Sequence, residues 1–240
     1  MATFGQPNAK EQGKESIVDD FMYGSNVASA HVYIRMGFLR KVYGILTTQI
    51  LLTVIVSALF MSNEGVQKYI HSNQWMMTVS LFGTFIAIFA LMWKRHETPT
   101  NYILLGVFTL LEAYTIGVIV TFYTVSSVIE AFVLTLGVFV ALTLYTLQSK
   151  RDFSAWGASL FSFLWILILA GFMQILFPSV MMDKAIAVGG ALLFSLFIIF
   201  DTHLLMHKLS AEEYIVAAVN LYLDIINLFL HLLRLFGERK

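Results

Sequence analysis

The chain has 240 residues, of which 58% are hydrophobic and only 12% are charged, and its mean hydropathy is +0.78. A soluble domain has about a quarter of its residues charged, so this composition excludes an ordinary soluble domain. The net charge of zero gives no general attraction to nucleic acid, and the lack of cysteine excludes disulfides, thiolate catalysis and cysteine-based metal sites.

Residues 1–35 are polar and mixed in charge, and we expect a cytosolic N-terminal tail without a cleavable signal peptide. Seven apolar segments follow, each of roughly the 20 residues that a helix needs to cross a bilayer. They are expected at about residues 38–61, 75–93, 102–123, 128–147, 155–177, 185–206 and 214–236, joined by short loops such as NEGVQKYIHSN. The sequence therefore predicts an all-α membrane protein, a seven-transmembrane-helix bundle in which residues 36–240 form the transmembrane domain.

The basic residues predict the orientation of the bundle. With the N-terminus in the cytosol, ten of the 15 Lys and Arg residues fall on the cytosolic side, as the positive-inside rule requires. Three of the other five (Arg234, Arg239 and Lys240) follow the last segment. That segment therefore either crosses the membrane despite the rule or dips in and returns as a re-entrant hairpin.

The last segment carries polar residues at successive steps of four, three, four and three, which place them within an arc of roughly 80° on a helix. We call this set the polar stripe; its members are Asn220, Asp224, Asn227, His231 and Arg234. Hydrogen bonding to a neighbouring helix is one explanation. An acid and two potential cations exceed what packing needs, so we favour an aqueous or ion-lined cavity.

A second acid, Asp201, ends the apolar run AIAVGGALLFSLFIIFD. A carboxylate at membrane depth is costly and normally faces a partner or a water-filled cavity. If neighbouring helices bring Asp201 and Asp224 together, the two carboxyls titrate as one unit, sharing a proton at mildly acidic pH and attracting a cation once it is lost. The alternative is that Asp201 lies at a helix end near the interface, since His203 and His207 follow closely.

Other candidates are more isolated. Glu112, in the middle of the third span, is another intramembrane acid, and Glu130 fits an interface position near the start of the fourth span. Lys94, at the end of the second span, fits snorkelling to the headgroups or a reach to an inward-facing aspartate as its counter-charge. His203 and His207 have the spacing of a two-histidine metal site, but without a third ligand we do not expect zinc.

Several stretches carry a family resemblance. The runs IIFDTHLLMHKLSAEEY and VNLYLDIINLFLHLLRLF resemble the signature of the transmembrane Bax-inhibitor motif family, and FTLLEAYTIGVIVTFY and YTLQSKRDFS are similar to its Lifeguard branch. The resemblance covers nearly the whole chain. It implies a seven-helix fold with the last helix central and ringed by the other six.

The resemblance also implies a di-aspartyl pH sensor at Asp201 and Asp224, where calcium would bind, and a Ca²⁺ leak from intracellular stores that damps apoptotic Ca²⁺ release. It implies residence in the Golgi membrane and also the endoplasmic reticulum, with no enzymatic activity and no tightly bound cofactor. Bacterial relatives pair the first aspartate with an arginine where this chain has Lys94. A lysine cannot make the bidentate hydrogen bonds to a carboxylate that an arginine makes. Expected partners are the lipid bilayer, calcium, and calcium-release channels or apoptosis regulators, with homo-oligomerisation left open and no nucleic acid.

Our leading interpretation is a pH-sensitive calcium leak channel, in which Asn220 and Asn227 help the two carboxylates to hold Ca²⁺. The alternative is a non-conducting membrane adaptor that regulates cell-death or calcium-release proteins. An intramembrane aspartyl protease also needs two facing aspartates, but it carries GxGD around the second acid where this chain has LYLD. We therefore disfavour the protease.

Overall fold

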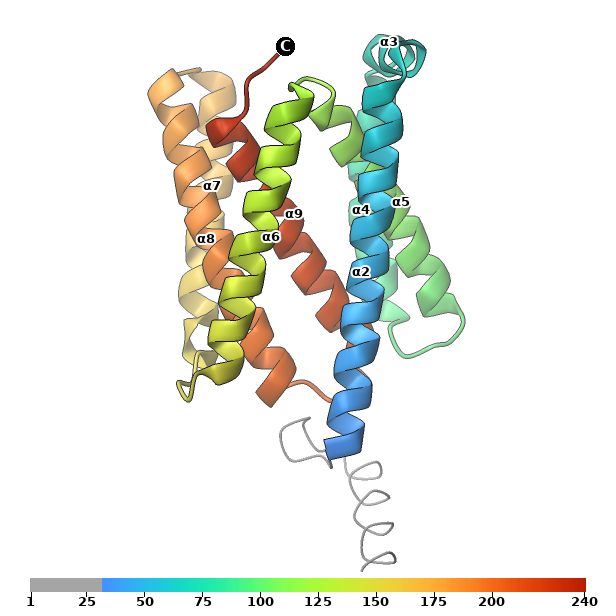
Figure 1. Ribbon diagram of the computed structural model, residues 1–240, viewed down its shortest axis with the longest axis vertical. Helices are drawn as coiled ribbons and strands as arrows, with labels where there is room; N and C mark the ends of the chain where they lie inside the picture. The colour runs from blue at the N-terminus through green and yellow to red at the C-terminus, as the bar shows by residue number, and fades with distance from the viewer. Residues whose placement is uncertain (1–31) are drawn as a thin grey trace, which may run out of the picture.

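The structure is a computed structural model that describes residues 32–240. Within this range, seven helices are long and apolar enough to cross a membrane, and each predicted span overlaps one of them (Figure 1). Their bounds are α2 (Val32–Ser62), α4 (Trp75–Trp93), α5 (Thr100–Val120), α6 (Val125–Gln148), α7 (Gly157–Leu176), α8 (Val180–His207) and α9 (Tyr214–Phe236). The all-α, seven-helix membrane bundle is thus confirmed, while most of the expected tail lies outside the described residues.

The connection after the first span was expected to be a loop, and this prediction was wrong. It contains the helix α3 (Glu64–Ser72). The side chain of Asn63 accepts a hydrogen bond from the Val66 backbone N–H at 3.1 Å, which caps the helix, and Ile70 is buried against the bundle. Hydropathy marks only membrane-embedded segments, so a polar helix lying outside the bilayer escapes it. A second short element, η1 (Ser154–Trp156), precedes α7.

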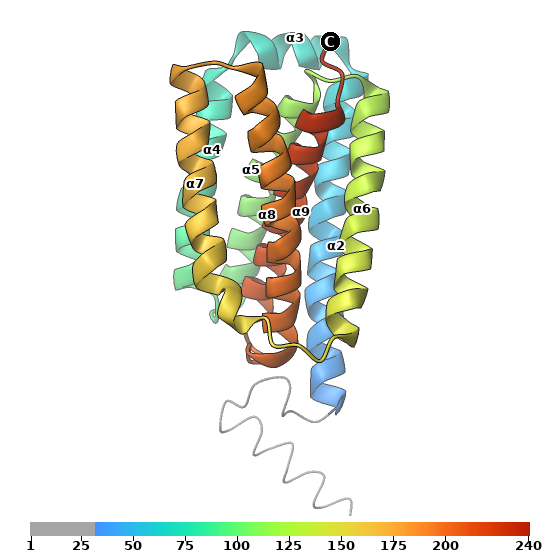
Figure 2. The same cartoon turned by 90° about the vertical axis from the view of Figure 1, so that its left-hand side faces the viewer.

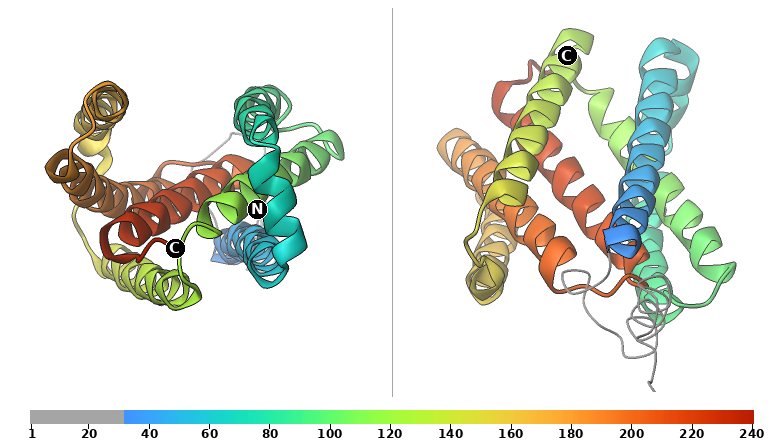
Figure 3. Two further views of the ribbon diagram at one scale, coloured as in Figure 1. Left: turned by 90° about the horizontal axis from the view of Figure 1, so that it is seen from above. Right: turned by 60° about the horizontal axis from the view of Figure 1, so that its bottom comes forward.

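The bundle has two groups of helices with α9 between them (Figures 2 and 3). In one group α5 packs against α2 and α4, and in the other α8 packs against α6 and α7. Helix α9 is the most buried of the seven and packs against α8, α6 and α2. The expected ring of all six helices around it stays unconfirmed, because α4 and α7 pack on α5 and α8 towards the outside.

The last segment crosses the bundle as one continuous helix, Tyr214–Phe236, and the C-terminus lies at the end opposite to the start of α2 (Figure 1). The re-entrant hairpin is therefore not adopted. The final residues are held against the connection between α5 and α6: the Thr124 backbone N–H donates to the Glu238 carbonyl at 3.0 Å, and the Lys240 N–H donates to the Phe122 carbonyl at 2.9 Å.

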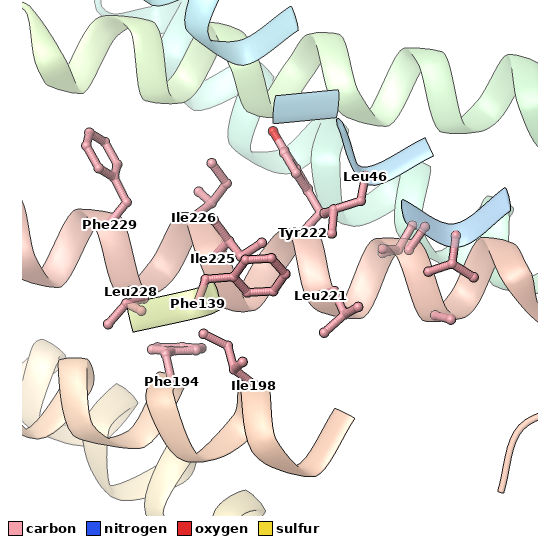
Figure 4. Packing of buried hydrophobic residues seen from close by; sticks show 14 of the residues in the cluster. Leu46, Phe139, Phe194, Ile198, Leu221, Tyr222, Ile225, Ile226, Leu228 and Phe229 are labelled. Carbon is pink, nitrogen blue, oxygen red and sulfur yellow. The ribbon is translucent and has the colours of Figure 1, made fainter. Parts of the chain in front are cut away.

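The core gathers around α9, where side chains from α2, α6 and α8 meet it (Figure 4). Tyr222 is its largest fully buried side chain. The Tyr222 ring contacts Phe108 of α5 edge to face, with centroids 5.8 Å apart, and its hydroxyl lies 2.8 Å from the Thr53 hydroxyl of α2. These contacts tie α9 to the α2–α5 group, so α9 links both halves of the bundle.

Candidate functional site

The two intramembrane aspartates lie side by side at the interface of the last two helices. The side chains of Asp201 on α8 and Asp224 on α9 are close enough to interact electrostatically, and Asn220, one turn before Asp224, also interacts with Asp201. Asp224 is buried, at 5% exposure, and Asp201 is half-buried. We call this pair the dyad. Helices α8 and α9 share the most extensive helix–helix interface in the described bundle, which fixes the two carboxyls relative to each other.

The dyad has no basic partner: across residues 32–240, neither aspartate takes part in an ion pair. One oxygen of Asp224, Oδ2, is buried and has no hydrogen-bond partner in the described part of the chain. An ionised carboxylate only accepts hydrogen bonds, so a bond between two carboxyls requires a proton between them. Leaving a buried acceptor unpaired costs about 1–3 kcal/mol, more if it is charged. A proton or a cation at the dyad would remove this cost.

The remaining members of the polar stripe contact α8 or their own helix. The Asn227 amide donates to the Leu223 carbonyl at 2.8 Å, within α9. The His231 ring stacks on Phe194 of α8, with centroids 5.6 Å apart, and its buried Nδ1 has no hydrogen-bond partner among the described residues. His231 also packs directly on Gly190.

Arg234 completes the stripe at the opposite end of α9 from Tyr214. Its guanidinium contacts Asp183 near the start of α8, with Nε donating to Oδ1 at 2.9 Å and the terminal nitrogen NH2 contacting the same oxygen. The stripe thus meets α8 at both ends, through one carboxyl pair and one ion pair. This arrangement corresponds to the interhelix hydrogen bonding that we considered from the sequence, and the ion-lined cavity stays a prediction.

The other candidate residues lie apart from the dyad. Glu112 is half-buried on α5 and has no hydrogen bond or ion pair in the described chain, though it interacts electrostatically with Tyr222. Glu130 is exposed on α6. Lys94 caps the end of α4, where its ammonium contacts both oxygens of Glu97 at 2.8 Å. Helix α4 packs mainly on α5 rather than on α8, and Lys94 pairs locally with Glu97 rather than with the dyad.

A contact between an acid and a histidine, close to the dyad along α8, was missed from the sequence. The exposed Asp152 carboxylate lies 2.9 Å from His203 Nε2. Hydrogen bonds from Ser154, together with His203, hold the pKa of Asp152 down at about 2. The Asp-Phe-Ser order in QSKRDFS was the available signal, since an aspartate side chain commonly accepts from the N–H two residues on, here Ser154 at 2.8 Å.

The two histidines of α8 do not form a metal-like arrangement. The His203 and His207 rings stack with centroids 4.4 Å apart and an interplanar angle of 23°. Residues 32–240 contain no group of three or more His, Asp or Glu side chains placed to hold a metal. Any cation at the dyad would be held by two carboxylates together with amide or water oxygens.

Fold and site together define a polytopic helical membrane protein whose last two helices enclose a carboxyl pair. Residues 35–240 match the family model described as inhibitor of apoptosis-promoting Bax1. The chain is 54% identical over 221 residues to protein lifeguard 4 of Mus musculus, covering 92% of this chain and 93% of that protein. It is also 54% identical over 220 residues to the Golgi anti-apoptotic protein of Vaccinia virus (strain Lister), with the same coverage of 92% and 93%. Bax inhibitor 1 of Schizosaccharomyces pombe is 41% identical over 221 residues, which cover 92% of this chain and 83% of the yeast protein.

The chain therefore belongs to the Bax inhibitor family. This confirms the resemblance indicated by the run IIFDTHLLMHKLSAEEY, which contains Asp201, and by the run VNLYLDIINLFLHLLRLF, which contains Asp224.

Proposed function

We propose that the chain is a pH-sensitive calcium leak channel of intracellular membranes, gated by the dyad. The observation that supports this proposal is the pair of carboxyls, Asp201 and Asp224, held together at a buried helix interface without a basic partner. With one proton between them, the two side chains hydrogen-bond and hold α8 against α9. This protonated form is the closed state.

Loss of the proton changes the balance at that interface. Two unit charges about 4 Å apart repel by about 4 kcal/mol at an effective dielectric constant of about 20. A change of that size shifts a two-state equilibrium by roughly a thousandfold, enough to separate α8 from α9 at the dyad. Ca²⁺ offsets the repulsion because it prefers carboxylate and amide oxygens, and the Asn220 side chain is beside Asp201. The deprotonated dyad would then be the first site at which an ion binds along the open path.

The names of the relatives support the cellular setting. The viral relative is called a Golgi anti-apoptotic protein, so we propose a Golgi membrane location, with the endoplasmic reticulum as a further site, and a role in inhibiting apoptosis. A leak that lowers store calcium would do this by reducing the Ca²⁺ available to calcium-release channels, without an enzymatic step. We place the N-terminus in the cytosol because the connections between helices at the end of the bundle where α2 begins are rich in basic residues. These residues are Lys94, Arg95, Lys150, Arg151 and Lys208.

The proposal is tested by reconstituting the full chain in liposomes and recording Ca²⁺ flux from mildly acidic to mildly alkaline pH. The wild-type flux should rise with pH. Asp201→Asn and Asp224→Asn should each flatten this dependence, because asparagine keeps the shape of the side chain but cannot ionise. Glu130→Gln, which removes an exposed acid from α6, is the matched control and should keep the wild-type profile. If no variant conducts Ca²⁺ at any pH, the channel is refuted and the non-conducting adaptor becomes the better account.

A further inference from the structure

A groove unrelated to the dyad runs along the outer surface between α2 and α5. Its volume is about 480 Å³, within the range of roughly 300–1,000 Å³ that is usual for ligand pockets. Both helices lie in the half of the bundle away from α8 (Figure 3). The groove is lined at one end by Arg40, Lys41 and Tyr102, and farther along by Gly44, Gly106 and Leu52.

One end of the groove is basic, and because it lies just before the apolar part of α2 we expect it at the level of the lipid headgroups. Arg40 and Lys41 come just before the apolar part of α2, and Tyr102 and Tyr214 are at the starts of α5 and α9. The Lys41 ammonium lies 3.3 Å from the centroid of the Tyr214 ring and 6.0 Å from that of Tyr102. Tyrosines are enriched at this depth of a bilayer, and the aromatic faces hold the ammonium in place. The side chain of Arg40 is exposed and makes no hydrogen bond or ion pair within residues 32–240.

The rest of the groove is mostly apolar, with Gln49 and two threonines among its lining residues, and it is about as long as one leaflet is thick. From Arg40 to Leu52 the helix rises about 18 Å, against about 15 Å for half of the hydrocarbon core. The two threonines of the groove spend their hydroxyls on their own helices: Thr48 donates to the Gly44 carbonyl at 2.9 Å, and Thr109 donates to the Leu105 carbonyl at 2.7 Å. The Thr109 hydroxyl also accepts from the Gln49 amide at 3.0 Å, and Gln49 Oε1 is buried without a hydrogen-bond partner among the described residues. The bilayer around the groove offers hydrocarbon to fill its apolar part.

Two exposed glycines make the space for such a ligand. A Cβ atom built on Gly44 or Gly106 would have no heavy atom within 4 Å, other than the neighbouring backbone, so neither glycine is required by helix packing. A free phosphate would match the basic end alone, and a neutral lipid would match the apolar part alone. Only a molecule with both chemistries uses the whole groove.

We propose that the groove binds an anionic glycerophospholipid of the leaflet on the side where α2 begins. Its phosphate sits at Arg40 and Lys41, because a guanidinium can donate two hydrogen bonds to phosphate oxygens. One acyl chain lies along Gly44 and Gly106 towards Leu52. This site is independent of the dyad and of calcium conduction.

The test is native mass spectrometry of the full chain, purified in detergent and titrated with phosphatidylserine or phosphatidylcholine of identical acyl chains. Two variants address the two halves of the site, each with a control on the same helix. Arg40→Gln removes the basic end, and Arg35→Gln removes an exposed arginine outside the groove. Gly44→Leu fills the apolar part, and Gly37→Leu adds the same bulk at another glycine with open space around it.

We expect the wild type to retain phosphatidylserine in preference to phosphatidylcholine. Arg40→Gln should lower phosphatidylserine retention about fivefold, because one basic residue usually raises the affinity for an anionic lipid surface by about that factor. Gly44→Leu should abolish retention, and both controls should behave as the wild type. Equal retention of the two lipids, or full phosphatidylserine retention by Gly44→Leu, would overturn the proposal. So would displacement of the lipid by soluble glycerophosphoserine, since that would show a site for the headgroup alone. If Gly44→Leu fails to fold, Gly106→Leu on α5 fills the same space.

Discussion

The substitution Gly190→Ala tests how α8 and α9 are held in register beside the dyad. A methyl group at Gly190 would overlap the ring of His231, because the ring lies directly over the glycine. His231 is itself confined by its stacking on Phe194, so the ring has little room to move aside. His231 lies two turns along α9 from Asp224, so a displacement of His231 would also change the position of the carboxyl pair.

The expected cost follows from two opposing effects. Replacing glycine by alanine inside a helix gains up to about 1 kcal/mol in helix propensity. Overpacking a tight contact costs about 1–3 kcal/mol. Gly189→Ala is the matched control, since a Cβ atom there meets only Leu167 Cδ1, at 4.0 Å. Both variants receive the propensity gain, so Gly190→Ala should be less stable than Gly189→Ala by about 1–3 kcal/mol, the overpacking cost alone.

The free energy of unfolding of the two variants is measured by denaturant titration of the full chain in detergent micelles. A second pair of variants adds His231→Ala. In that background the ring is gone, so Gly190→Ala should cost nothing, and the coupling between the two sites should equal the overpacking cost of about 1–3 kcal/mol. If Gly190→Ala and Gly189→Ala are equally stable, or if Gly190→Ala is as costly without His231, the contact does not hold the two helices and the reasoning is refuted.

Three other contacts give further predictions. Tyr222→Phe should lower the free energy of unfolding by about 1 kcal/mol, because it removes the hydroxyl bonded to Thr53; an unchanged denaturant midpoint would contradict this. Arg234→Lys should also destabilise the protein, by about 1 kcal/mol, because lysine cannot reproduce the fork that contacts Asp183; stability equal to wild type would show that the charge alone suffices. Since the pKa of Asp152 is lowered to about 2, its carboxylate stabilises the fold above the ordinary value of 3.8, and this contribution disappears as the pH falls through about 2. Thermal unfolding of Asp152→Asn should accordingly show a deficit at neutral pH that shrinks over that acidic range.

Some features were predictable because they depend on composition or on spacing along one helix. The apolar runs predicted all seven spans, because the hydrocarbon core sets their length whatever their packing. Their ends were less accurate: α2 begins at Val32 and α8 at Val180, since a helix continues into the headgroup region after its apolar residues end. The spacing of the polar stripe likewise predicted which residues of α9 share a face.

Contacts between distant segments were harder to predict. Nothing in the sequence alone says that Arg234 meets Asp183, because the pairing depends on how α8 and α9 cross. The same limit applies to Lys94, whose sequence position suited an aspartate partner but whose place on α4 leaves it with Glu97. The juxtaposition of Asp201 and Asp224 was stated only conditionally for this reason. Its condition, that the two helices be neighbours, is met in the structure.

If the proposed function is right, Asp201 and Asp224 share one proton and lose it as a unit. Infrared difference spectroscopy of the full chain in lipid measures this most directly, because it detects protonated carboxyl groups as the pH is raised. The account predicts a carboxyl signal whose titration is altered by Asp201→Asn and equally by Asp224→Asn, but not by Glu112→Gln, which removes another intramembrane acid. Two signals that titrate independently, each lost with only one of the two aspartates, would contradict it.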